Sequence, residues 1–314
     1  MSQLNAMSQN DLALKRDLRT AKLKRSIFII LMIIVPILNF LIFYCYVNFS
    51  SILMAFKDAD GSLTFENFKL VWNQLFNTPQ KEMLLYLKNT MYYFITGAFV
   101  ILPLTVIIAY FIYKKIWGFR FFRVMFFMPH IISSVILVTL YKNLLVDLGP
   151  VAQFFKQIIG MDPYAPISFF TDPKYATGAI IAYCIWTGFG TNLILFSGAM
   201  ARIPEDVLEA CQLDGVSWGR EIVSIILPLI WPTFTTTVVM QFVGIFTSSG
   251  PLHLFTKGGA DTNTISYFIF QQTESAYGNK NYASAVGIFF TLISVPIVFS
   301  VKKGMERWQD AIEY

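Results

Sequence analysis

Charge is the first thing that this chain of 314 residues has little of. Asp, Glu, Lys and Arg make up 14% of it, against 55% hydrophobic residues, whereas a soluble domain carries about 25% charged residues. This composition excludes an ordinary soluble protein and indicates an integral membrane protein. The net charge of +5 gives no reason to expect nucleic acid as a partner, because the basic residues lie beside apolar runs, where they orient a protein in the bilayer.

Residues suited to covalent or metal chemistry are scarce as well. The cysteines at positions 45, 184 and 211 are too scattered for a disulfide framework or a metal site, and two histidines are too few for one. No G-x-x-x-x-G-K-[ST] motif occurs, so the chain does not itself hydrolyse ATP through a P-loop. The apolar runs hold no carboxylate, which disfavours a membrane-embedded hydrolase and a proton-coupled transporter. We expect no enzyme activity, no cofactor and no metal in this chain.

Long uncharged runs are what the chain has instead. Each is close to or above the roughly 20 residues that a helix needs to cross a bilayer. They predict an all-α membrane protein with six transmembrane helices, over residues 26–56, 89–113, 124–141, 175–201, 222–256 and 281–301. Lys and Arg flank the first, second and last runs on one side, which places both termini in the cytoplasm. We therefore expect a cytoplasmic N-terminal segment over 1–25, a transmembrane domain over 26–301 and a cytoplasmic tail over 302–314.

Three stretches are expected to depart from straight transmembrane helices. Pro129 lies inside the third run and should kink it. The fifth run, 222–256, is too long for one straight span, and residues 248–251 interrupt it late, so we expect a helix followed by an irregular, partly buried return. The sequence GPVAQFFKQIIG, at 149–160 in an external segment, is expected to form a short helix at the membrane interface.

A polar loop over residues 202–221 separates the fourth and fifth runs. It carries five acidic residues and two basic ones, against the basic trend of the other cytoplasmic segments. Pro204 followed by Glu205 and Asp206 is typical of the first turn of a helix. Gly215 is typical of a helix stop, and Ser217 of the cap of a second helix. We predict two short cytoplasmic helices, hinged at Gly215, that lie against another protein.

The loop contains a spaced motif that identifies it. The pattern runs E-A-x, three residues, G, nine residues, I, one residue, L-P, and its members are Glu209, Ala210, Cys211, Gly215, Ile225, Leu227 and Pro228. It resembles the E-A-A loop of ABC-importer permeases, with Cys211 in place of the second alanine. The segment WTGFGTNLILFSGAMARIPEDVLEA, from Trp186, is similar to maltose-type sugar permeases. So are FTKGGADTNT, where Ala260 replaces the usual proline, and QQTESAYGNKNYASAVG. The resemblance runs from Phe28 to the C-terminus.

This resemblance implies a fold, a function and partners. The fold is that of a type I ABC-importer permease, with six spans and a cytoplasmic coupling-helix loop over 202–221. The function is that of a permease subunit in an ATP-driven, binding-protein-dependent importer of a sugar, an oligosaccharide above all, in a bacterial inner or plasma membrane. The implied partners are a second, homologous permease subunit (a heterodimer), two ATPase subunits that bind ATP and Mg, and an extracytoplasmic solute-binding protein. The residues implied in coupling to the ATPase are Glu209, Ala210, Cys211, Asp214, Gly215, Ile225, Leu227 and Pro228.

The resemblance also implies which residues contact the solute. Counting from the matched tryptophan and the matched L-P gives Thr187, Gly188, Thr191, Gln241, Ile245 and Ser248, to which Asn192 is added as a neighbouring polar residue. From the residues alone, Gln241 is an amide in an uncharged run and should face the interior of the helix bundle, because an unsatisfied amide in lipid is costly. The same polar groups could instead hold helices together, and this alternative stays open.

Other functions remain to be separated from the leading one. The chain could serve an importer of another neutral solute such as a polyol. It could also be a channel or a secondary transporter that acts alone, or an anchor that only docks an ATPase. An uncharged set of solute-contacting residues disfavours strongly ionic solutes, because a buried ion needs a fixed counter-charge.

Overall fold

Helices and the turns between them make up the described structure. This computed structural model describes the backbone of residues 2–312 except 59, 78, 80, 161 and 163–167, and side chains within 19–308 apart from those positions and 159. Over these residues no strand forms beyond an isolated antiparallel bridge between Lys57 and Leu63. The prediction of an all-α protein is confirmed.

The helices follow one another along the chain with short connections. The first part comprises α1 (Ser2–Asn39), the π-helical turn η1 (Phe40–Tyr46), α2 (Val47–Ala55) and α3 (Glu66–Phe76). The second comprises α4 (Glu82–Ile95), the π-helical turn η2 (Thr96–Ile101), α5 (Leu102–Tyr113), α6 (Phe119–Ile131), α7 (Ser134–Leu144) and α8 (Pro150–Ile159). The third comprises α9 (Pro173–Thr187), α10 (Gly190–Met200), α11 (Glu205–Leu213), α12 (Trp218–Glu221), the π-helical turn η3 (Ile222–Ile226) and α13 (Leu227–Leu229). The last comprises α14 (Trp231–Val243), α15 (Leu252–Phe255), α16 (Ile265–Glu274) and α17 (Lys280–Ile312).

Six membrane spans are compatible with this arrangement. Four continuous stretches are long and apolar enough to cross a bilayer, namely Arg19–Ala55, Glu82–Tyr113, Pro173–Met200 and Lys280–Trp308. Two sharply bent pairs also qualify when each pair counts as one span, α6 with α7 and the stretch Trp218–Leu229 with α14. These stretches coincide with the six predicted runs. The last predicted run belongs to a longer helix, because α17 continues to Ile312, into the segment that was expected to be a separate tail.

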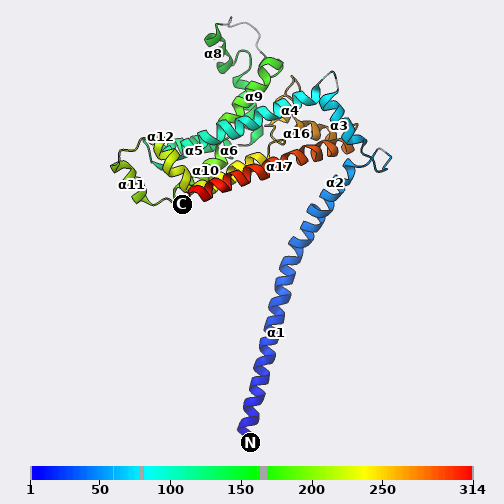
Figure 1. Ribbon diagram of the computed structural model, residues 1–314, viewed down its shortest axis with the longest axis vertical. Helices are drawn as coiled ribbons and strands as arrows, with labels where there is room; N and C mark the ends of the chain where they lie inside the picture. The colour runs from blue at the N-terminus through cyan, green and yellow to red at the C-terminus, as the bar shows by residue number, and fades with distance from the viewer. Residues whose placement is uncertain are drawn as a thin grey trace.

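The first span stands apart from the other helices for much of its length. α1 extends away from the body of the molecule (Figure 1), and every described side chain from 19 to 49 is exposed. Its C-terminal end is different, because α2 packs against α17, which also contacts α3, α14 and α16. The apolar N-terminal part of this span therefore has no packing partner within the described chain.

Two of the predicted spans are broken more sharply than the sequence suggested. α6 and α7 meet at 106°, and the break lies at Ile132 and Ser133, whereas Pro129 is buried inside α6. The expectation of a kink at Pro129 was therefore wrong in its position. The fifth run bends by 86° at Ile230, which was not predicted. The irregular return is confirmed, since no helix forms between Val243 and Leu252.

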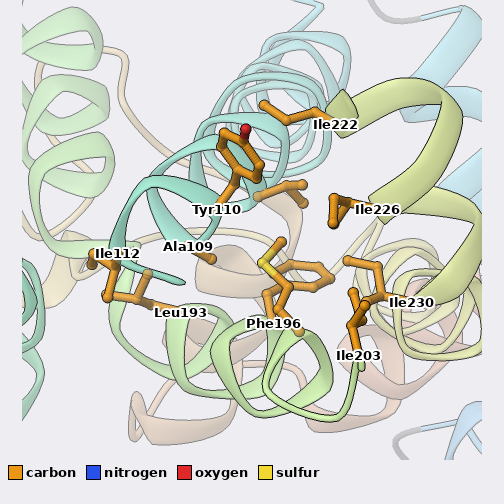
Figure 2. Packing of buried hydrophobic residues seen from close by; sticks show 11 residues of the cluster. Ala109, Tyr110, Ile112, Leu193, Phe196, Ile203, Ile222, Ile226 and Ile230 are labelled. Atoms are coloured by element: carbon orange, nitrogen blue, oxygen red, sulfur yellow. The ribbon is translucent and has the colours of Figure 1, made fainter. Parts of the chain in front are cut away.

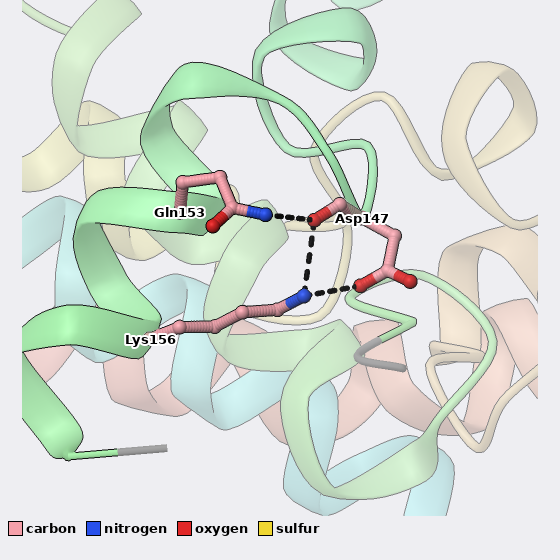
Figure 3. A network of polar contacts seen from close by, with 3 residues as sticks. All are labelled: Asp147, Gln153 and Lys156. Atoms are coloured by element: carbon pink, nitrogen blue, oxygen red, sulfur yellow. Dashed lines mark hydrogen bonds and ion pairs between the residues drawn. The ribbon is translucent and has the colours of Figure 1, made fainter. Parts of the chain in front are cut away.

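The predicted external helix forms as α8, with an unusual distribution of its side chains. Lys156 is only 1% exposed. Its ammonium nitrogen lies 2.7 Å from Asp147 Oδ1 and donates to the Asp147 carbonyl oxygen, to which Gln153 Nε2 also donates (Figure 3). Phe154 and Ile158 are exposed on the outside, at 62% and 66%. The polar side of α8 is thus fixed inward and its apolar side faces outward; its position at the membrane interface stays a prediction.

Candidate functional site

The polar loop folds into the two short helices expected of it. α11 begins directly after Pro204, which occupies the N-cap position rather than the first turn, and Glu205 and Asp206 lie in that turn. Their carboxylates interact favourably with the positive helix end. α12 begins after Ser217, which holds the cap position with an extended backbone, but its side chain makes no capping hydrogen bond. The predicted position of Ser217, at the start of the second helix, is therefore confirmed. The expectation that its side chain caps this helix was wrong.

The turn between the two helices is a Schellman motif centred on Gly215. Gly215 has φ +64°, its N–H donates to the Gln212 carbonyl at 3.2 Å, and the Val216 N–H donates to the Cys211 carbonyl at 3.1 Å. This pair of bonds satisfies the last carbonyl groups of α11 and reverses the chain. The predicted hinge is therefore a fixed turn whose direction depends on one left-handed residue.

The turn leads to a prediction at Gly215. A Cβ atom at this position would meet no atom within 4 Å, so only the backbone conformation resists substitution. Gly215→Val should destabilise the turn by about 1–2 kcal/mol, because valine enters the left-handed region at a steric cost. Gly215→Asn should keep the turn nearly as stable as in the parent, because asparagine tolerates that region. Limited proteolysis of the loop in both variants tests this, and equal cleavage of the two would contradict it.

The motif residues divide into an outward set and an inward set. Glu209, Ala210, Asp214 and Gly215 are exposed, whereas Cys211 is 5% exposed. Ile225, Leu227 and Pro228 are half-buried. Sequence reasoning missed two apolar side chains beside the turn, Leu213 and Trp218, which are 88% and 60% exposed. The loop therefore presents carboxylates and large apolar groups on one short, rigid hairpin, which is a composition suited to binding another protein.

A hydrophobic cluster connects the base of the loop to two membrane spans (Figure 2). It combines residues of α5, of α10 and its following turn, and of η3 and Ile230: Val106, Ala109, Tyr110, Ile112, Leu193, Phe196, Met200, Ile203, Ile222, Ile226 and Ile230. The spacing of Ile222, Ile226 and Ile230 places one face of this segment against α5 and α10. Through this cluster the loop is packed onto the membrane domain rather than merely tethered to it.

A buried charge lies at the edge of this cluster. Glu221, the last residue of α12, is 4% exposed. Its Oε1 lies 2.7 Å from Lys114 Nζ, and its Oε2 accepts a hydrogen bond from the Tyr110 hydroxyl at 2.9 Å. We call these three residues the polar clasp. The charges of Glu221 and Lys114 are visible in the sequence, but their pairing across 107 positions is not.

Two of the residues predicted to contact solute, Gly188 and Gln241, lie against η2. A methyl group on Gly188 would lie 2.8 Å from Ile101 Cδ1, and one on Gly97 would lie 3.2 Å from Gln241 Oε1. η2 thus contacts both the fourth and the fifth span. π-helical turns inside helices are frequent at functional sites. Sequence reasoning identified Gln241 and Gly188 but not Gly97, which lies against the Gln241 amide.

The other candidates have individual surroundings. The hydroxyl groups of Thr187 and Ser248 each donate to the carbonyl group four residues earlier, at Tyr183 in α9 and at Gly244 in the irregular segment after α14. Ile245 is buried at 7%, and Asn192 is half-buried. Thr191 is exposed, and its hydroxyl lies 3.0 Å from His130 Nε2 of α6.

One further polar group lies near these residues without a partner. Within the described chain the Tyr93 hydroxyl is buried and forms no hydrogen bond. A methyl group on Gly250 would lie 2.9 Å from Cys184 Sγ and 3.2 Å from Tyr93 Cε1. Tyr93 and Cys184 therefore flank the irregular segment that follows α14. A buried unsatisfied hydroxyl is rare and calls for an explanation.

Comparison with known proteins decides the family. Residues 101–308, more than half of the chain, match the family described as "Binding-protein-dependent transport system inner membrane component". The chain belongs to that family. The matched segment contains the loop, the cluster beneath it and every residue predicted to contact solute. Membership in this family confirms the predicted ABC-importer permease, a transport component of the inner membrane rather than an enzyme.

Similar proteins extend over most of this permease. It is 26% identical over 283 residues to a probable ABC transporter permease protein, YesP, of Bacillus subtilis, covering 87% of this chain and 88% of that protein. It is 26% identical to the lactose transport system permease protein LacF of Rhizobium radiobacter, covering 84% and 85%. Two crystal structures of a bacterial alginate ABC transporter resemble it, at 24% and 22% identity and TM-scores of 0.75 and 0.74. They cover 90% of this permease and 96% and 95% of the matched chains, and they confirm the fold.

Proposed function

We propose that this permease is a membrane subunit of an ATP-driven importer that takes up a neutral oligosaccharide delivered by a binding protein. The observation that carries the proposal is the loop over 202–221, which keeps the spacing of the permease motif and folds into two short helices joined at Gly215. A sugar as solute is supported by the similarity to a lactose permease. A transporter that acts alone has no need of such a loop.

The loop is proposed to dock in one ATPase subunit. Its outward set, Glu209, Ala210, Asp214 and Gly215, forms the docking face together with Leu213. Its inward set, Cys211, Ile225, Leu227 and Pro228, holds that face on the membrane domain. The exposure of the first set and the burial or partial burial of the second support this division. ATP and Mg bind in the partner ATPase under this proposal.

The solute is proposed to pass beside η2. Gly188 and Gln241 lie there on two different spans, and Thr187, Thr191, Asn192, Ile245 and Ser248 complete the candidate set. None of these side chains carries a charge, which favours a neutral sugar over an ionic one. The Tyr93 hydroxyl, buried without a partner among the described residues, is a further candidate for bonding to a sugar hydroxyl.

The assembly is proposed to contain a second homologous permease subunit, two ATPase subunits and an extracytoplasmic binding protein. The exposed apolar length of the first span supports a partner in the membrane. Residues 1–25 and 302–314 are proposed to lie in the cytoplasm on either side of a permease domain over 26–301. The packing of Trp231 against Trp308, with ring centroids 4.2 Å apart, places the end of α17 next to the base of the loop and supports this side for the C-terminus.

Uptake by the reconstituted transporter tests the proposal. The proteoliposomes contain this permease, its partner permease and the ATPase, and the binding protein is added to them. They are expected to accumulate a labelled neutral oligosaccharide only when ATP is present on the side of the membrane where the ATPase lies. A panel with polyols and acidic sugars identifies the solute class. Uptake that persists without the ATPase would instead indicate a channel or secondary transporter. ATPase recruitment without any uptake would indicate an anchor.

A further inference from the structure

Among the described residues, polar groups join the coupling loop to the second span at two points: the Tyr113 hydroxyl donates to the Ile203 carbonyl at 3.5 Å, and Glu221 pairs with Lys114 and Tyr110. Glu221 ends α12, and Lys114 and Tyr110 belong to the inner end of the second span. Glu221 Oε2 accepts a hydrogen bond from the Tyr110 hydroxyl at 2.9 Å. Oε1 forms an ion pair with the Lys114 ammonium at 2.7 Å but accepts no hydrogen bond among the described residues. The carboxylate is thereby fixed in position and orientation with respect to α5.

Burial makes this connection different from a surface ion pair. The side chains of Glu221 and Lys114 are 5% and 18% exposed, whereas those of Lys302 and Glu306, which form an ion pair on α17, are 53% and 55% exposed. An exposed pair separates easily, because water replaces each partner. A buried carboxylate has no such replacement, so separation of Glu221 from Lys114 would leave an uncompensated charge. The clasp therefore resists being pulled apart.

The surrounding apolar contacts cannot supply the same constraint. The cluster of Figure 2 packs η3 against α5 and α10, but apolar contacts are non-directional, and packed helices can shift past one another. The hydrogen bond from the Tyr110 hydroxyl to the Glu221 carboxylate has a preferred distance and direction, and the Lys114 ion pair adds an attraction to the same carboxylate. The clasp fixes the register of α12 on α5, while the cluster holds the two segments together.

The clasp also lies on a continuous path to the solute candidates. α5 continues without interruption from η2, and η2 contacts Gly188 and Gln241. A displacement of the loop that moves Glu221 would move the inner end of α5, and with it η2, which contacts the fourth and fifth spans. No other described ion pair joins the loop to a span.

We propose that Tyr110, Lys114 and Glu221 form the rigid joint that transmits movement of the coupling loop into the second span, with Glu221 as the positioning residue. This inference rests on the proposed docking of the loop in an ATPase. It assigns to the clasp a role in coupling that is separate from the docking contacts on the outward face. Loss of the clasp should leave the ATPase bound and active but poorly connected to transport.

The test measures solute molecules imported per ATP hydrolysed by the complete reconstituted transporter. Glu221→Gln and Lys114→Met are each expected to lower this ratio about fivefold or more, with ATP hydrolysis retained. The double variant Lys114→Glu with Glu221→Lys should recover a large part of the ratio, because the opposite charges meet again. Lys302→Met, which breaks the exposed pair on α17, is the matched control and should leave the ratio unchanged.

Tyr110→Phe keeps the test decisive if the charge variants do not assemble. It removes only the hydroxyl group that holds Glu221 Oε2 and retains the ring in the cluster, so assembly should be normal and the ratio lower than that of the parent. An unchanged ratio of solute imported to ATP hydrolysed in the assembled variants would overturn the inference. A variant that assembles poorly, but whose assembled complexes show a normal ratio, would overturn it as well. If Glu209→Lys uncouples transport while Glu221→Gln does not, the clasp alone is refuted. If neither variant uncouples transport, the proposed docking of the loop in an ATPase is refuted together with the clasp.

Discussion

Replacing Glu209 by lysine is expected to abolish ATP-driven uptake while the permease still reaches the membrane. Glu209 is exposed on α11, and in the described chain it takes part in no ion pair. Its carboxylate is therefore available to a basic group of the ATPase. Charge reversal is expected to replace attraction by repulsion at the proposed docking face, and loss of an interface charge can lower affinity by about thirtyfold or more. Uptake and ATP hydrolysis are measured together in proteoliposomes.

The control for this variant is another charge reversal at an exposed acidic residue. Glu306→Lys lies on α17, near the end that packs beside the loop, and its carboxylate is exposed and only weakly held by Lys302 at 3.7 Å. Its uptake is expected to equal that of the parent. Normal uptake by Glu209→Lys would refute the docking role of the loop, whereas equal damage by both variants would point to a general effect of charge.

Replacing Gln241 by leucine is expected to weaken solute binding with little effect on assembly. Leucine is close to glutamine in size, so the contact with Gly97 at η2 is largely kept. The amide is lost, and a sugar hydroxyl that it bonds would be left unpaired, at a cost of about 1–3 kcal/mol. The apparent KM for the loaded binding protein, which delivers the solute, should therefore rise between about fivefold and 150-fold. Uptake rates at increasing concentrations of the loaded binding protein measure it.

A threonine on the same helix provides the comparison. Thr236 is exposed on α14, and its hydroxyl donates to the Pro232 carbonyl at 2.8 Å within the helix. Thr236→Val removes a polar group without removing a free hydrogen-bonding group, so its KM should not change. An unchanged KM in Gln241→Leu would show that this amide serves helix packing, which is the alternative that the sequence leaves open.

The spans and the loop could be predicted because their signals are local. Uncharged runs indicate where the membrane is crossed, and Gly215 indicates the turn, because a left-handed residue is needed there. The bend at Ile230 also has a local cause: Pro232 lacks an N–H, so the helix that begins at Trp218 cannot continue through it with all its bonds. The sequence contained this signal, but the expected departure from a straight helix was placed later in the run, at residues 248–251.

The break between α6 and α7 has no comparable local cause. Pro129 is accommodated inside α6, and the chain changes direction only at Ile132 and Ser133. Beyond the break, Leu137 and Val138 are buried in a cluster with Ile180 and Tyr183 of α9. Packing against a distant span therefore fixes the direction of α7, and no pattern within the run reports it. The polar clasp could not be predicted for the same reason, because Lys114 and Glu221 meet only through the fold.

The same limit applies to the solute candidates. Positions matched to known permeases identify Gly188 and Gln241 separately, and the structure adds that both contact η2. Thr191 was selected on the same grounds, yet its hydroxyl lies against His130. Which of these groups face one solute depends on the two bent spans and on the partner permease. Their shared role therefore stays a proposal.

Photocrosslinking from the tip of the loop tests the central claim most directly. Leu213 is 88% exposed beside the hinge. Tyr277 is fully exposed between the fifth and sixth spans, a segment that six spans with cytoplasmic termini would place on the opposite side of the membrane. A photoreactive benzoylphenylalanine at 213, in membranes that hold the complete transporter, is expected to capture the ATPase subunit, and the same group at 277 is expected not to. Capture of the ATPase from 277, or none from 213, would contradict the account of a permease that receives its driving force through this loop.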